Sequence, residues 1–144
     1  MYVRDSIRFR VLQDFMSDEF EVLWMQILPK RLPRGISSII VGMVYHPPSA
    51  CDSSMRNYLC ESMSSLEAHF PDCGLILLGD FNKLNLFRVA NAFGVNQVVP
   101  FPTRGQRKLD LVFTNLNAYY DTPRKLSPFG LSDHATVEVQ PLER

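Results

Sequence analysis

The sequence lacks an excess of charge of either sign. Its 144 residues include 15 Lys and Arg and 15 Asp and Glu, so the formal net charge is zero at pH 7. A polycationic chain is therefore excluded, and any nucleic-acid contact must come from a local basic patch, because phosphate contacts supply most of the affinity. Cysteine is scarce too. Cys51, Cys60 and Cys73 show no metal-ligand spacing, and their odd number argues against a disulfide framework.

Long apolar runs are also missing. The two longest, Ile39–Tyr45 (interrupted by Gly42) and Leu75–Leu78, are far shorter than the roughly 20 residues that cross a bilayer. The N-terminus lacks the positive cluster and apolar stretch of a secretory signal. Hydrophobic residues nevertheless make up 46% of the chain, and a chain of this length buries about 68–70% of its unfolded surface. These features predict one intracellular domain with no membrane partner.

Strand-like and helix-like segments alternate along the chain. Strands are expected at Phe20–Ile27, Ser37–Tyr45, Leu75–Leu78, Lys108–Phe113 and Ala135–Val139. Apolar residues at helical spacing predict a helix from Met55 to Phe70, capped by Asp52, Ser53 or Ser54 and closed by Pro71. A shorter helix over Leu86–Phe93 ends at Gly94. This order, β-β-α-β-α-β-β, favours α/β layers around one core.

Polar residues that can do chemistry stand at or in four of the five expected strands. They are Tyr45-His46 after the second, Asp80-Phe81-Asn82 after the third, Asp110 inside the fourth, and Ser132-Asp133-His134 before the last. Each has a structural alternative, since a carboxylate after a strand often forms a turn and an Asp-His pair is often structural. Their joint occurrence at strand ends is typical of a catalytic site in a layered α/β domain.

Four segments together resemble the endonuclease/exonuclease/phosphatase superfamily. Three are Gly79-Asp80-Phe81-Asn82, Pro102-Thr103-Arg104 leading to Asp110, and Leu131-Ser132-Asp133-His134. The fourth, Val44 to Ser49, resembles the Tyr-x-Pro-Pro-Ser segment of the apurinic-type endonuclease domains of non-LTR retrotransposons. They stand in the family's order between about Phe20 and Val139. The resemblance implies an α/β fold, part of a four-layered α/β sandwich with two mixed β-sheets flanked by helices, and metal-dependent hydrolysis of DNA.

The resemblance also implies a catalytic role for five residues. Asp80 would activate the attacking water, Asn82 would hold that water or a phosphate oxygen, and Tyr45 would contact the scissile phosphate. His134 would stabilise the phosphate and transfer a proton. Asp110 would hydrogen-bond to the ring of His134, since a carboxylate fixes an imidazole's tautomer and raises its basicity.

The remaining implied contacts involve the metal and the DNA. Asp133 would help to bind Mg²⁺ or Mn²⁺, a hard cation that prefers oxygen ligands. The basic residues Arg104, Arg107 and Lys108 would meet DNA phosphates, the alternative being a solvated loop. His46 and His69 receive no role.

One expected part of the family pattern is missing. Domains of this family carry an early strand Asn and a metal-binding Glu, and no acidic residue ahead of Tyr45 has the family's surrounding pattern. We therefore expect residues 1–144 to be a single, N-terminally truncated domain that binds metal weakly and exposes strand edges. The expected partner is the rest of a polyprotein that contains a reverse transcriptase. The domain would act on DNA in the nucleus, although the sequence contains no basic nuclear-localisation segment.

Two other functions remain open from the sequence. One is a phosphatase of the same superfamily, acting on inositol lipids or nucleotides. The other is a non-catalytic remnant that serves as a binding or structural module. The Tyr-x-Pro-Pro-Ser segment favours DNA over the phosphatase. The missing Glu favours the remnant, and the intact set of Asp80, Asn82, Asp110, Asp133 and His134 argues against it.

Overall fold

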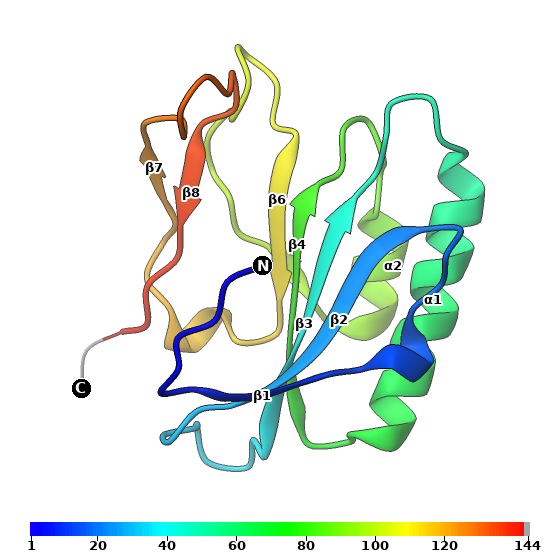
Figure 1. The fold of residues 1–144 in the computed structure, drawn as a ribbon, viewed down its shortest axis with the longest axis vertical. Coiled ribbons are helices and arrows are strands. Elements are labelled where there is room, and N and C mark those ends of the chain that lie inside the picture. The colour runs from blue at the N-terminus through cyan, green and yellow to red at the C-terminus, as the bar shows by residue number, and fades with distance from the viewer. Residues whose placement is uncertain (143–144) are drawn as a thin grey trace.

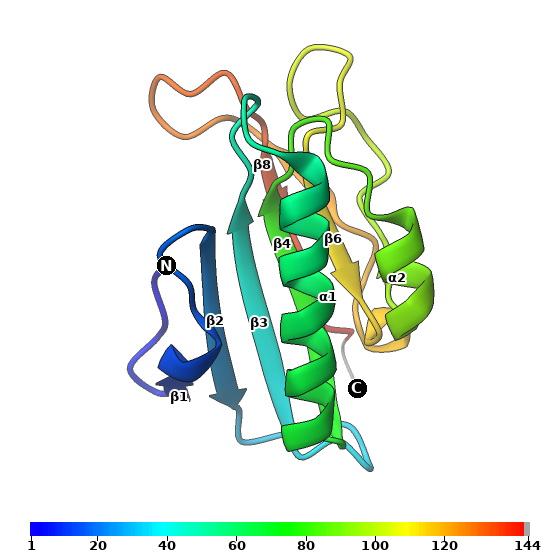
Figure 2. The same cartoon turned by 90° about the vertical axis from the view of Figure 1, so that its right-hand side faces the viewer.

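The computed structural model describes residues 1–142, which form an α/β structure in layers. The strands are β1 (Arg8–Val11), β2 (Glu21–Leu28), β3 (Ser38–Tyr45), β4 (Cys73–Asp80), β5 (Asn96–Gln97), β6 (Asp110–Thr114), β7 (Arg124–Leu126) and β8 (Thr136–Glu138). The helices are α1 (Asp52–His69) and α2 (Phe87–Phe93), with short 3-10 turns η1 (Gln13–Phe15) and η2 (Asn117–Tyr119). Figures 1 and 2 show α1 and α2 on one face of the main sheet and the β7–β8 hairpin on the other side. The expected class, a layered α/β sandwich, is confirmed.

The main sheet is mixed and has six strands in the order β1-β2-β3-β4-β6-β5. Only β3 and β4 run parallel, and the other neighbours pair antiparallel. A parallel pair needs a crossover connection, which α1 provides between β3 and β4. The smaller sheet consists of β7 and β8, paired antiparallel.

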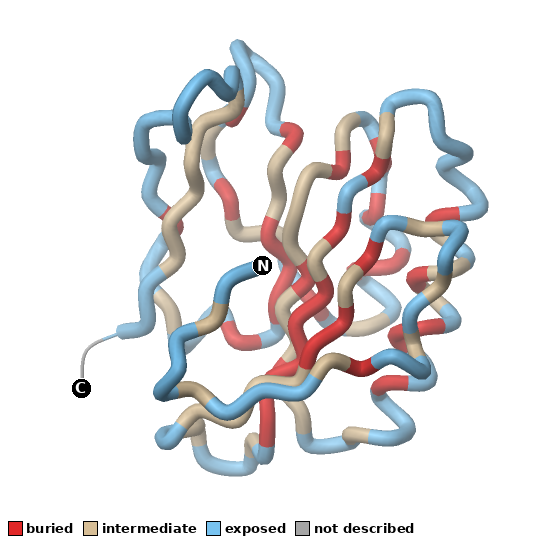
Figure 3. The backbone as a smooth tube through the Cα atoms, viewed as in Figure 1, coloured by how far each residue is buried: buried red, intermediate tan, exposed pale blue. Residues whose placement is uncertain are grey.

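The core lies between the sheet and the two helices. Buried residues concentrate in the middle strands, as Figure 3 shows, and β3 is buried over most of its length, as its apolar sequence predicted. Trp24, which is fully buried, lies so close to Gly42 that a Cβ at that glycine would be 2.4 Å from the indole ring. The helical stripe that includes Met55 and Leu59 faces this core. Neither α1 nor any other helix within residues 1–142 has both the length and the apolar character needed to cross a bilayer.

The structure differs from the sequence-based expectations at several element ends. β1, β5 and β7 were not expected, since two to four residues are too few for a periodic pattern. The predicted cap of α1 is wrong, because Cys51 occupies the N-cap position without a side-chain cap hydrogen bond. Asp110 begins β6 and does not lie inside it. Gly94 caps α2 in the left-handed conformation (φ 67°), as predicted.

Candidate active site

A row of polar side chains lies where β3 and β4 end and β6 begins. In the register of the sheet, Tyr45 of β3 lies opposite Asp80 of β4, and Asp80 lies opposite Asp110 of β6. Residues that face each other across a ladder point to the same side of the sheet. Within β4, Asp80 shares its side with Ile76 and not with Leu77, whose side chain belongs to the core under the helices. The row therefore lies on the sheet face opposite α1 and α2.

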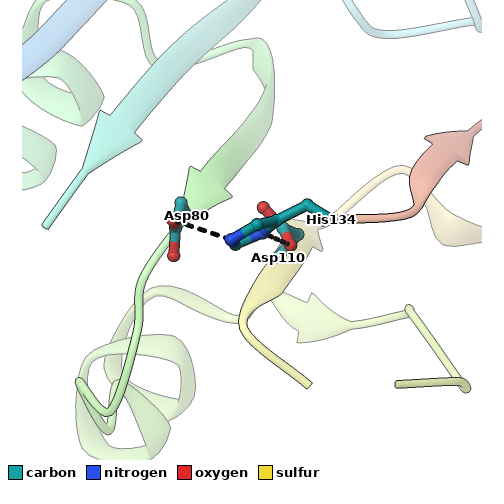
Figure 4. A group of neighbouring side chains, drawn as sticks. All are labelled: Asp80, Asp110 and His134. Carbon is teal, nitrogen blue, oxygen red and sulfur yellow. Dashed lines mark hydrogen bonds and ion pairs between the residues drawn. The ribbon is translucent and has the colours of Figure 1, made fainter. Parts of the chain in front are cut away.

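His134 joins this row from the loop that connects β7 and β8. Its Nδ1–H donates to Asp110 Oδ2 over 2.6 Å, and its Nε2 lies 3.9 Å from Asp80 Oδ2. Figure 4 shows the imidazole between the two carboxylates. Ligand atoms of these three residues all lie within 4.8 Å of one another, and no other such group of three occurs within residues 1–142. The structure thus brings together three residues that are 30 and 24 positions apart in the chain.

Thr103 links the two segments that carry Asp110 and His134 through hydrogen bonds. Its side chain is buried, and Oγ1 accepts the backbone N–H groups of Leu109 (3.1 Å) and Asp110 (3.0 Å). Its carbonyl oxygen accepts the N–H of Ala135 over 2.6 Å. A buried hydroxyl with two donors pointing at it holds the backbone firmly, because losing either bond would leave a buried polar group unpaired. Thr103 therefore sets the approach of His134 to Asp110.

Asn82 sits at the other end of the site in a backbone conformation that few residues adopt. Its φ is 49°, the one positive value for a non-glycine within residues 1–142, and asparagine tolerates this region better than most side chains. The Asn82 N–H donates to Asp80 Oδ1 (3.0 Å), and its Nδ2 donates to the carbonyl oxygen of His46 (2.6 Å). Asp80 and Asn82 are thus held as one unit.

The other expected site residues lie at the rim. Asp133 Oδ1 is 3.8 Å from His134 Nε2, while its Oδ2 accepts from Arg104 Nε over 2.7 Å. The expected metal ligand is therefore paired with an expected DNA contact, through an exposed pair of the kind that contributes about 0–1 kcal/mol. Arg107 and Lys108 are exposed on the same loop as Arg104. Tyr45 is 45% exposed at the end of β3.

Three carboxylates lie around the imidazole of His134 and raise its pKa. The hydrogen bond to Asp110 is the main cause that raises the pKa of His134 above its ordinary value of 6.5, partial burial opposes it, and the charges of Asp110, Asp80 and Asp133 add to it. With a protonated imidazole the four groups carry a formal charge of −2, which a divalent cation would offset. Oxygen donors from two or more carboxylates are also the ligands that Mg²⁺ and Mn²⁺ accept. The residues present therefore fit a divalent metal ion.

The site opens into a cleft of about 340 Å³ between the two sheets. Asp80 and Asp110 lie on its wall. The rest of the lining is mainly apolar and includes Leu78 and Val112 from the large sheet and Val137 from β8. A carboxylate next to apolar walls interacts more strongly with a nearby charge than it does in open water. The cleft thus gives the site a partly sheltered side and an open side.

Comparisons with known proteins identify the fold. No protein-family profile and no curated protein matches the sequence. Among solved structures, the endonuclease domain of TRAS1, a telomere-specific non-LTR retrotransposon, matches with a TM-score of 0.74 and 16% identity over 98% of this chain and 72% of that chain. This chain has the fold of a non-LTR retrotransposon endonuclease domain. Because the two sequences are only 16% identical, the match shows a shared fold and nothing about activity.

A second structure resembles the chain less. A functionally unknown conserved protein from Enterococcus faecalis V583 matches with a TM-score of 0.48 and 11% identity over 96% of this chain and 66% of that chain. A likeness this weak adds no evidence about the fold of this chain.

Sequence reasoning missed two residues that the structure connects to the site. Thr103 belongs to a recognised motif, but no local pattern indicated that its hydroxyl would hold the backbone of Asp110. His46 received no role, yet it is buried and its backbone binds both Asp80 and Asn82. A histidine directly after an apolar strand and before two prolines was the available signal.

Proposed function

We propose that this chain belongs to the DNA endonuclease domain of a non-LTR retrotransposon polyprotein and hydrolyses phosphodiester bonds with the help of a divalent metal. The observation that carries the proposal is the convergence of Asp80, Asp110 and His134 at one edge of the sheet. The fold shared with a retrotransposon endonuclease domain supports it. The rest of such a polyprotein, including a reverse transcriptase, would be the partner, and nuclear DNA the substrate.

The arrangement suits attack of water on a phosphate. Asp80 has one carboxylate oxygen held by the Asn82 N–H and the other near His134 Nε2, so it is placed to accept a proton from the water. His134 has Nδ1 engaged by Asp110, which leaves Nε2 to donate to a phosphate oxygen or to the leaving group. The raised pKa of His134 favours the protonated form that this donation needs.

The other residues would bind the substrate and the ion. Asn82 would hold the water or a phosphate oxygen, and Tyr45 would contact the scissile phosphate from the neighbouring strand. Asp133 would hold Mg²⁺ or Mn²⁺, which would supply positive charge to the charged transition state. The exposed loop with Arg104 and Arg107, followed by Lys108, would meet the DNA backbone.

Plasmid nicking tests the proposal. The 144-residue chain is incubated with supercoiled plasmid in Mg²⁺, in Mn²⁺ and in EDTA, beside the variants His134→Ala and His69→Ala. His69 is the matched control, because it is an exposed histidine whose ring binds the Ser65 carbonyl within α1. We expect metal-dependent nicking that falls by about 10²–10⁴-fold in His134→Ala, the range of a lost general acid, and stays unchanged in His69→Ala.

Two results would contradict the endonuclease proposal. A folded chain that binds duplex DNA without nicking it would be a non-catalytic binding module. Release of phosphate from inositol phosphates or nucleotides, with the plasmid left intact, would indicate a phosphatase. Nicking that survives His134→Ala would mean that this histidine does not act in the reaction.

A further inference from the structure

His46 contacts the site through its backbone on two sides. Its N–H donates to the carbonyl oxygen of Asp80 (2.9 Å), and its own carbonyl oxygen accepts from Asn82 Nδ2 (2.6 Å). One residue thus holds the main chain of Asp80 and the side chain of Asn82 together. Since one amide hydrogen of Asn82 is used in this bond, the plane of its amide group is set, and Oδ1 and the second hydrogen remain available for other partners.

The ring of His46 ties this backbone to the start of α1. The residue is 1% exposed, and its Nε2–H donates to Asp52 Oδ1 over 2.7 Å. Asp52 is the first residue of α1 and half exposed. Only a short connection that begins with Pro47 and Pro48 separates the two, and each proline fixes its own φ, so few soft torsions remain between the strand and the helix. The ring contact therefore closes a stiff loop next to the site.

Stability alone does not explain a histidine at this position. Within residues 1–142, the Nδ1 of His46 is the one buried side-chain nitrogen or oxygen that has no hydrogen-bond partner. A buried unpaired polar atom destabilises a fold relative to a paired one, and an apolar side chain of similar size would avoid that loss. The contact that the ring does make, with Asp52, is therefore the feature that calls for an explanation.

We propose that His46 is a positioning residue, whose ring, anchored on Asp52, holds the backbone carbonyl that orients Asn82. The inference deepens the proposed nuclease function and rests on it for its effect on rate, but the structural link can be tested apart from activity. Neither His46 nor Asp52 touches the substrate in this scheme. Their loss would act through Asn82.

The first test is kinetic and uses the 144-residue chain. His46→Ala and Asp52→Ala should each lower kcat for plasmid nicking by about 10–100-fold, the range found when a supporting contact is lost, with little change in KM. Asp52→Asn keeps an acceptor oxygen for the ring and should restore most of the rate that Asp52→Ala loses. Ser53→Ala, the next position of the same helical turn, is the control and should behave as the unaltered chain.

A double-mutant cycle separates positioning from a general loss of stability. In the Asn82→Ala background the substitution His46→Ala should cause no further decrease in kcat, because the group on which it acts is gone. Effects that multiply in the double variant would overturn the proposal. So would a fall in melting temperature without a change in kcat at a temperature where all variants are folded.

The second test does not depend on activity. The side-chain amide signals of Asn82, recognised in a ¹⁵N–¹H spectrum by their loss in Asn82→Ala, should shift in His46→Ala and in Asp52→Ala and stay in place in Ser53→Ala. Asp52 is half exposed, so its variant gives the answer if His46→Ala fails to fold. Unchanged signals would refute the positioning role. A shift in a chain that does not nick would instead refute the nuclease function and keep the structural link.

Discussion

Gly79, directly before Asp80, packs against β3 too closely for any side chain. Its φ is 141°, and a Cβ there would lie 1.8 Å from the carbonyl oxygen of Val44. The obstacle is backbone, so no change of rotamer relieves it. In Gly79→Ala, β3 and β4 must separate where they carry Tyr45 and Asp80. We therefore expect the substitution to weaken the fold and the site together.

The size of the effect follows from two contributions. A non-glycine residue in this region of φ costs about 1–3 kcal/mol. Separation of the strands removes at least one backbone hydrogen bond of the ladder, worth about 0.5–1.5 kcal/mol. Together they predict a loss of about 1.5–4.5 kcal/mol in the free energy of unfolding. With about 2–4 °C per kcal/mol for a domain near this size, the melting temperature should fall by roughly 3–18 °C.

Gly94→Ala is the matched control for the backbone clash. Gly94 also has a positive φ (67°), but a Cβ there would meet no heavy atom within 4 Å. Its substitution therefore carries the conformational strain of about 1–2 kcal/mol without the clash. Urea unfolding can be followed by the fluorescence of Trp24, the one tryptophan and fully buried. Equal losses in the two variants would refute the close approach of β3 and β4 beside the site.

The remaining predictions concern single groups in and around the site. An NMR titration of the metal-free chain should give His134 a pKa above 6.5, and Asp110→Asn should lower it; no change on substitution would refute the Asp110 contact. Because the folded pKa is raised, protonated His134 adds stability below about pH 6.5, and this stability is lost as the pH rises through the folded pKa. Hydrogen bonds from the Ser53 and Ser54 hydroxyls lower the pKa of Cys51 to about 7, so at pH 7 iodoacetamide should label it before the other two cysteines, as mass spectrometry can show. Thr103→Val should lower the free energy of unfolding by about 1–3 kcal/mol and should also slow nicking, whereas Thr103→Ser should retain both stability and activity. Equal losses in the Val and Ser variants would contradict the hydroxyl contacts. In DNA-binding assays at several salt concentrations, Arg107→Ala should reduce the slope of log K against log salt by about one, and an unchanged slope would exclude a phosphate contact.

Most long elements could be predicted because their signals are local. The apolar stripe from Met55 to Leu66 repeats at the helical period, and the apolar run of β3 needs no distant partner to be recognised. The short strands carry too few residues for any period to appear. The cap of α1 was mispredicted because it depends on a contact outside the helix. Asp52 is a residue type that often caps helices, but its carboxylate instead accepts a hydrogen bond from the buried ring of His46.

The candidate site divides in the same way. The order of the amino acids already defines which chemical groups are present, namely carboxylates, an amide and an imidazole at the ends of strands. Which of these groups meet depends on the folded chain. The register of β3, β4 and β6 places Tyr45, Asp80 and Asp110 in one row, and the hydrogen bonds of Thr103 bring His134 to that row. These contacts join residues far apart in the chain, and strand pairing and loop closure depend on packing of the whole domain, which no local pattern of residues records.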